Sequence, residues 1–64
     1  MGRKLKILRV MRGLTQAALA RKLGITQGAV SQWEVGNSFP SFPVLRKLAD
    51  VLGVAVDDLI EKGA

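Results

Sequence analysis

The chain has 64 residues, which is room for a single domain, and 48% of them are hydrophobic, enough to form a small core. It contains no cysteine and no histidine, which excludes disulfides, thiolate–zinc sites and catalysis by a Cys or His side chain. Its net charge of +5 is uneven, because residues 1–33 hold seven basic and no acidic side chains while residues 34–64 hold three basic and five acidic ones. Such a basic half favours a polyanionic partner such as nucleic acid, and is equally compatible with a merely solubilising surface.

The sequence predicts five short helices. In chain order they cover residues 3–12, 16–23, 27 to 34 or 35, 42–52 and 56–62. Three of them follow a hydroxyl residue that can cap the first turn, namely Thr15, Thr26 and Ser41. Four of them end before a glycine that can take the left-handed conformation, namely Gly13, Gly24, Gly36 and Gly53. No segment shows a convincing strand alternation, so we expect only helices.

An apolar stripe on the fourth predicted helix shows how these helices must pack. Leu45, Leu48, Ala49 and Leu52 recur at the spacing of one helix face. Helices of two or three turns are unstable alone in water, so they must bury such stripes against one another. The sequence therefore predicts a compact all-α domain over residues 1–64.

Residues 16–34 have the pattern of two helices joined by a sharp turn. Ala20 is small, so a second helix can cross close to the first, and Gly24 can supply the positive φ of the reversal. Val30 and Trp33 then fall on the face of the second helix that meets the first, which predicts that Trp33 is a core residue. This arrangement is that of a helix-turn-helix.

The same residues resemble the phage repressor and Cro-like helix-turn-helix family. Within the motif, the matching positions are Thr15, Gln16, Leu19, Ala20, Gly24, Ile25, Thr26, Val30, Ser31, Trp33, Glu34 and Gly36. After the motif, they are Pro40, Leu45, Leu48, Ala49, Leu52, Gly53, Val54, Leu59 and Ile60. The resemblance spans about residues 5–60 and implies a five-helix repressor-type domain, with the motif on helices two and three. It also implies a transcriptional regulator that binds duplex DNA sequence-specifically, as a homodimer on a two-fold symmetric site.

In such domains the second helix of the motif enters the major groove, and its first side chains reach the bases. The resemblance therefore implies base contacts by Gln27, Gly28, Ala29 and Gln32, and phosphate contacts by Gln16, Thr26, Asn37 and Ser38. The Gln27 amide has the geometry to bond adenine N6 and N7 together, which discriminates by about 1–3 kcal/mol. Gly28 departs from the family, because it brings no side chain to a position that often reads a base.

Other positions that match the family imply structural roles. Arg9 and Glu34 correspond to an arginine and a glutamate that form an ion pair between the first and third helices. Phe42 corresponds to an apolar position that packs, whereas Phe39 is expected at the surface, at a DNA-backbone or subunit contact. The region after the fourth helix is expected either to form the dimer contact or to close the core, through Val54, Val56, Leu59 and Ile60.

Further departures leave a second interpretation open. The loop after the third helix lacks the lysine or arginine often found there, and Ala18 and Ala55 replace residues that would assist capping. A protein-interaction module of the antitoxin or coactivator type, or an engineered variant with weak or no specific DNA binding, would fit the same fold. An enzyme does not fit, and no cofactor, metal ion, small-molecule ligand or membrane partner is expected. Without a long apolar segment, we expect a cytoplasmic protein.

Overall fold

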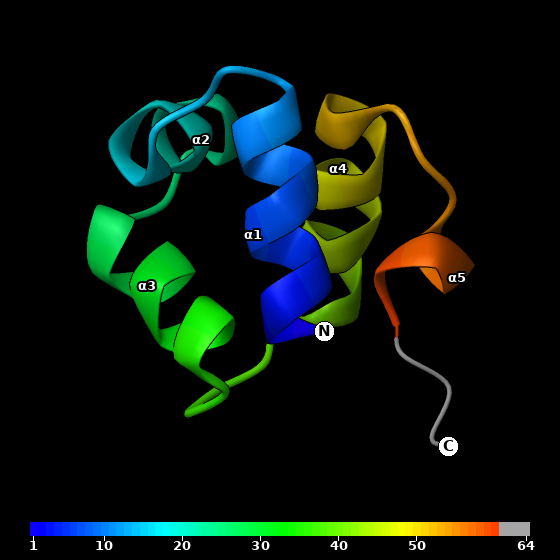
Figure 1. Cartoon of the computed structure of the whole chain (residues 1–64). Coiled ribbons are helices and arrows are strands. Elements are labelled where there is room, and N and C mark those ends of the chain that lie inside the picture. Colours follow the sequence, from blue (N-terminus) through cyan, green and yellow to red (C-terminus); the bar gives the residue numbers. More distant parts are fainter. Residues whose placement is uncertain (61–64) are drawn as a thin grey trace.

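The computed structural model describes residues 1–60, which form five helices around one core (Figure 1). They are α1 (Gly2–Met11), α2 (Gln16–Leu23), α3 (Gln27–Val35), α4 (Phe42–Leu52) and α5 (Val56–Leu59). α1 lies in the middle, with α2 and α3 on one side and α4 and α5 on the other (Figure 1). The described residues contain no strand, and the predicted all-α class is confirmed. None of these helices has the length and hydropathy needed to cross a bilayer.

Two of the three predicted hydroxyl caps are formed. Thr15 Oγ1 accepts a hydrogen bond from the Ala18 backbone N–H at 3.0 Å, and Thr26 Oγ1 accepts one from the Ala29 N–H at 3.2 Å. Ser41 also directly precedes its helix, but its side chain accepts no hydrogen bond from the first turn, so this predicted cap is wrong. A proline in the first turn of α4 has its φ already set for a helix, which helps α4 to begin without the cap.

α5 is shorter than the predicted segment 56–62. It ends at Leu59, because Ile60 has an extended backbone with φ of −85° and ψ of 115°. Residues 61 and 62 lie outside the described residues. Ala55 offers no capping side chain, as predicted, and its backbone N–H instead donates to Asp58 Oδ2 at 3.1 Å.

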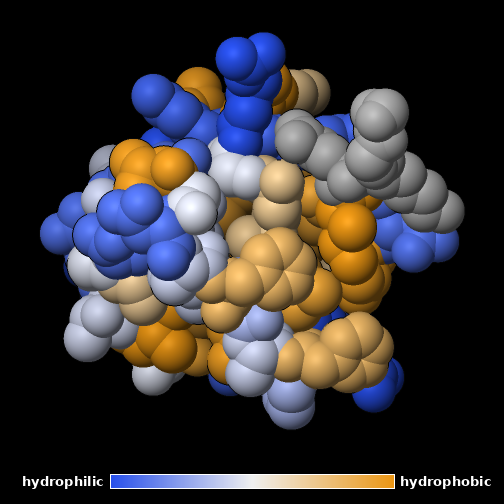
Figure 2. Space-filling view, turned by 90° about the horizontal axis from the view of Figure 1, so that it is seen from below, coloured by the Kyte–Doolittle hydropathy of each residue, from blue (hydrophilic) through white to orange (hydrophobic). Residues whose placement is uncertain are grey.

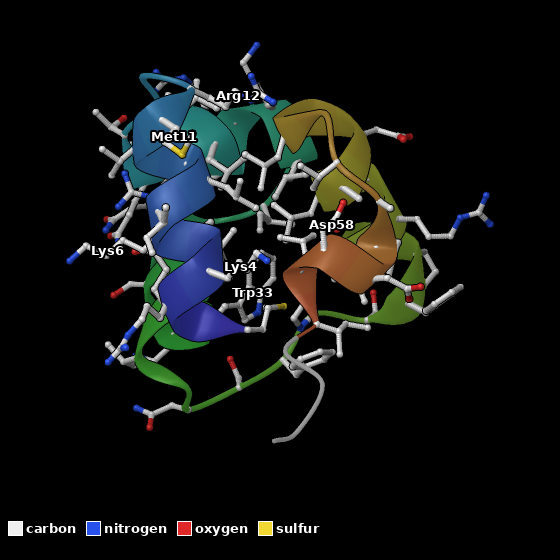
Figure 3. All side chains as sticks on the ribbon, turned by 45° about the vertical axis from the view of Figure 1, so that its right-hand side comes forward. Lys4, Lys6, Met11, Arg12, Trp33 and Asp58 are labelled. Carbon is white, nitrogen blue, oxygen red and sulfur yellow. The ribbon has the colours of Figure 1, made fainter. Side chains whose placement is uncertain are left out.

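The core is built from one face of every helix. Its buried hydrophobic residues are Leu5, Leu19, Ala20, Leu23, Val30, Trp33, Leu45, Leu48, Ala49, Leu52 and Leu59. The four residues of the predicted α4 stripe are all in this set. Trp33 is 6% exposed, and Figure 3 shows it directed into the interior between the helices. Its predicted core position is confirmed.

Phe42 is not packed as predicted, because 63% of its surface is exposed. It is the first residue of α4, and Pro40 of the preceding loop is buried instead. Phe39 in the same loop is 58% exposed, as expected. Figure 2 views the molecule from the side of this loop, and apolar side chains gather on the face that it shows.

Contacts at both ends of α1 fix it to its neighbours. At the beginning, Gly2 lies so close to the end of α3 that a Cβ atom would overlap the Glu34 carbonyl oxygen. At the other end, Arg12 Nε donates to the Leu52 carbonyl oxygen at 2.8 Å and thus satisfies an acceptor that the last turn of α4 leaves free. α1 is therefore held against α3 at one end and α4 at the other.

Gly2→Ala is expected to lower the free energy of unfolding by about 1–3 kcal/mol, because the new methyl group meets backbone atoms that cannot easily move. Gly28→Ala is the matched control. No heavy atom lies within 4 Å of a Cβ built there, and alanine favours a helix by about 1 kcal/mol, so stability should rise. Chemical denaturation of the three proteins measures both effects, and a Gly2→Ala variant as stable as the parent would contradict the close packing of α1 on α3.

Candidate nucleic-acid interface

The turn between α2 and α3 brings the beginnings of these two helices together. Gly24 ends α2 with a φ of 72°, which glycine adopts without strain. The first residues of the two helices are then in contact, because Gln27 Nε2 donates a hydrogen bond to Gln16 Oε1 at 2.8 Å. Two helix beginnings therefore share one surface, where backbone N–H groups without helical partners and two amide side chains meet.

Behind this surface, Gln16 is bound to a buried ion pair. Gln16 Nε2 donates to Glu34 Oε1 at 2.9 Å. Arg9 Nε donates to Glu34 Oε2 at 2.6 Å, and Arg9 Nη2 adds a longer hydrogen bond of 3.2 Å to Glu34 Oε1. The side chains of Arg9 and Glu34 are 10% and 4% exposed, and Arg9 Nη1 also donates to the Leu14 carbonyl oxygen at 2.7 Å. The ion pair expected between the first and third helices is thus present, and hydrogen bonds continue from it to Gln27.

The surroundings of Glu34 favour its ionised form. Burial alone would raise the pKa of this carboxyl group, but hydrogen bonds from Arg9 and Gln16 and the positive charges of Arg9 and Lys6 outweigh that effect. The pKa of Glu34 is therefore lowered below its ordinary value of 4.5. Lys6 points outward from α1 (Figure 3), so it acts on Glu34 through its charge and not through a hydrogen bond. At neutral pH both carboxylate oxygens of Glu34 can only accept hydrogen bonds.

The other expected base contacts differ in the groups that they present at the surface. Gly28 is exposed and has no side chain, and Ala29 is half-buried against the core. Gln32 is exposed, but its Oε1 already accepts a hydrogen bond from Asn37 Nδ2 at 3.0 Å. Gln27, at the beginning of α3, is likewise exposed, and its Nε2 donates one hydrogen bond to Gln16.

The expected phosphate contacts also lie at the surface. Thr26 Oγ1 accepts the capping bond of α3, which leaves its hydroxyl hydrogen to donate elsewhere. Ser38 and Asn37 are exposed in the loop that follows α3. Residues 27–45 contain no lysine or arginine, so neither α3 nor the loop after it brings positive charge to this surface.

The sequence profile of a helix-turn-helix family matches residues 5–59, which is most of the chain. The chain belongs to this family. The resemblance to phage repressors and Cro-like proteins is therefore confirmed, together with the helix-turn-helix at α2 and α3.

Relatives of this helix-turn-helix protein include regulators that match over most of their length and an enzyme that matches over part of its length. The uncharacterized HTH-type transcriptional regulator YazB of Bacillus subtilis is 36% identical over 58 residues, which cover 91% of this chain and 84% of YazB. The P22 c2 repressor protein, solved with synthetic operator 9T, has a TM-score of 0.90 at 30% identity. The match covers 94% of this chain and 91% of the repressor chain. Hydroxypropylphosphonic acid epoxidase from S. wedmorenis has a TM-score of 0.89 at 31% identity, over 98% of this chain but 34% of the epoxidase. The likeness to the enzyme thus concerns about a third of its length.

The hydrogen bonds that join Gln16 to Glu34 and to Gln27 were not predicted from the sequence. Gln16, Glu34 and Gln27 were instead expected in three separate roles, as a phosphate contact, a member of an ion pair and a base contact. The positions of Gln16 and Gln27 in the motif could have indicated that they lie close together, because a helix-turn-helix brings together the beginnings of its two helices. These positions do not give the direction of the hydrogen bonds of the two amides.

Proposed function

We propose that this helix-turn-helix domain binds duplex DNA sequence-specifically, as a transcriptional regulator of the repressor type. The observation that carries the proposal is the pairing of Gln16 and Gln27 at the beginnings of α2 and α3. It holds the Gln27 amide at the end of α3 that, in this kind of motif, enters the major groove. There the amide can bond adenine N6 and N7 together, which is worth about 1–3 kcal/mol of discrimination.

Gln16 retains a donor for the DNA backbone. One hydrogen of its Nε2 goes to Glu34 and its Oε1 accepts from Gln27, so the second amide hydrogen remains for a phosphate oxygen. The first N–H groups of α2 favour an anion at the same place. We therefore assign a phosphate contact to Gln16, with Thr26, Asn37 and Ser38 as further backbone contacts.

The relatives support this proposal. The P22 c2 repressor has nearly the same fold and was solved with an operator, and YazB carries the name of a transcriptional regulator. With duplex DNA as the ligand, we expect the protein to act in the cytoplasm, and we propose no enzymatic role.

Selection from a random pool of duplex DNA at low salt tests the proposal. We expect the parent protein to enrich a motif of two related half-sites that contain adenine, and the Gln27→Ala variant to lose the preference at one position of each half-site. The logarithm of affinity should fall with the logarithm of salt concentration, with a slope of about −0.9 for each neutralised phosphate. A folded protein that enriches no sequence would overturn specific DNA binding and favour the protein-interaction role instead.

We also propose that two copies bind together, as a homodimer on a two-fold symmetric site. The region first expected to make the contact offers little surface for it. Leu59 is buried in the core, and Val54 and Val56 pack against the core. Ile60, at 36% exposure, is the most exposed member of that set.

A more extensive apolar surface is formed by Phe39 and Phe42, which we call the phenylalanine surface. It is the most exposed aromatic area of the described residues. Full burial of an aromatic side chain removes about 150–250 Å² from water, so the two rings cover at most about 500 Å² per copy. A stable interface buries about 800 Å² per partner. We therefore expect the dimer to be weak in solution and to assemble on DNA, on half-sites about 34 Å apart.

A further inference from the structure

The hydrogen bonds between Arg9 and Gln27 have a fixed direction. Arg9 donates to Glu34, and the ionised carboxylate of Glu34 can only accept. Gln16 must therefore turn its Nε2 toward Glu34, which leaves its Oε1 for Gln27. Gln27 must in turn direct its Nε2 toward Gln16. The oxygen and the NH₂ group of an amide have almost the same shape, so packing alone does not distinguish its two orientations. The negative charge of Glu34 therefore decides the orientation of the Gln16 and Gln27 amides.

This orientation leaves Gln27 with one N–H donor and one oxygen acceptor for a ligand. Within residues 1–60, Gln16 is the hydrogen-bond partner of the Gln27 side chain. Adenine presents an acceptor at N7 and a donor at N6 in the major groove, whereas guanine presents two acceptors, N7 and O6. The Gln27 amide matches adenine at both atoms. Opposite guanine it can donate one hydrogen bond, while its Oε1 would face the O6 acceptor.

We infer that Glu34 sets the preference for adenine over guanine, by fixing the orientation of the Gln27 amide through Gln16. The inference rests on the proposed function and deepens it. The Glu34 side chain is 4% exposed and bound to Arg9, so it acts as a positioning residue and not as a DNA contact. It thereby has a second role besides joining α1 to α3.

Glu34→Gln should reverse the order of donors and acceptors. Arg9 Nε donates to Oε2 at 2.6 Å, the shortest hydrogen bond of the carboxylate, whereas Arg9 Nη2 donates to Oε1 at 3.2 Å. The oxygen of the new amide therefore takes the Oε2 side, its NH₂ group faces Gln16, and the longer bond from Arg9 Nη2 is lost. Gln16 must then turn its Oε1 inward and its Nε2 toward Gln27, whose own Oε1 turns inward to accept. Both amide hydrogens of Gln27 then face the groove, which is the pair of donors that guanine N7 and O6 require.

Equilibrium competition between two duplexes tests this inference. Both carry the sequence selected by the parent protein, and they differ by A·T or G·C at the base pair whose preference Gln27→Ala removes. We expect the parent protein to favour the A·T duplex by about tenfold or more, and Glu34→Gln to reduce this ratio by about fivefold or more, or to invert it. The control is Asp50→Asn, which makes the same change of charge at an exposed position of α4 and should keep the parental ratio.

Gln16→Met is a second variant that leaves the Arg9–Glu34 pair in place and decides the question should Glu34→Gln fail to fold. It breaks the connection to Gln27, so the ratio should approach one, while affinity for both duplexes falls because the phosphate contact is lost. Parental ratios in each of these variants that folds, with Gln27→Ala still removing the preference, would overturn the inference and leave the proposed function intact. A parent protein with no sequence preference would instead overturn the proposed function on which the inference rests.

Discussion

Glu34→Ala is expected to lower the free energy of unfolding by about 3 kcal/mol or more, because removing one partner of a buried ion pair leaves the other charge unpaired. Arg9 would lose both of its hydrogen bonds to Glu34 while its side chain stays 10% exposed. Only the Leu14 carbonyl oxygen would still accept from it. Domains of this size have total stabilities near the lower end of about 5–15 kcal/mol, so the loss should be large enough to unfold a sizeable fraction of the protein at modest temperature.

Urea denaturation followed by circular dichroism at neutral pH measures this loss. Asp50→Ala removes an exposed acidic side chain and should change stability by no more than about 0.5 kcal/mol. The double variant Arg9→Met/Glu34→Leu removes both charges, so it should be more stable than Glu34→Ala. If Glu34→Ala were as stable as the parent, the angle between α1 and α3 would be set by the apolar core alone.

The destabilisation caused by Glu34→Ala should itself depend on pH. Folding lowers the pKa of Glu34 below 4.5, so the ionised carboxylate stabilises the folded state at pH values above that ordinary value. This contribution is lost as the pH falls through the lowered folded-state pKa. The difference between parent and variant should therefore be constant near neutral pH and shrink below about pH 4.5. A difference that persists unchanged in stronger acid would contradict the lowered pKa.

Features that depend on near neighbours in the sequence could be predicted. Thr15 and Thr26 cap the helices that follow them, and Gly24 ends α2 with a positive φ, because each of these effects acts within a single turn. Periodicity also identified the buried stripe of α4. Phe42, in contrast, was expected to pack because it matches an apolar position of the family, but it is exposed.

The candidate site was predictable in its residues but not in its connections. The family resemblance implied roles for Gln16, Gln27, Arg9 and Glu34, and all four take part in one chain of hydrogen bonds. The direction of that chain follows from a carboxylate near the end of α3, far in sequence from the Gln16 amide that it orients. Such a direction depends on the packing of three helices against one another, which no local pattern in the sequence records.

Two copies are expected to bind neighbouring half-sites cooperatively, and the double variant Phe39→Ser/Phe42→Ser is expected to remove the cooperativity. On a duplex with two half-sites, the second copy should bind about ten- to hundredfold more tightly than the first, because the first holds it at high effective concentration. Titration of duplexes with one and with two half-sites measures this factor, and sedimentation without DNA should show mainly monomers. Ile7→Ser/Met11→Ser is the control, since it removes comparable exposed apolar surface from α1 and should leave cooperativity unchanged.

The duplex with one half-site separates the possible roles of the phenylalanine surface. If the two rings contact a second copy, Phe39→Ser/Phe42→Ser should bind one half-site as tightly as the parent. Weaker binding there would instead place Phe39 against the DNA backbone, and cooperativity that survives the substitutions would move the dimer contact elsewhere. A surface of at most about 500 Å² per copy is too small for a stable dimer in solution. We expect it to suffice on DNA, because two copies on half-sites one helical turn apart would hold the two surfaces at about millimolar effective concentration, at which a weak contact adds measurable affinity.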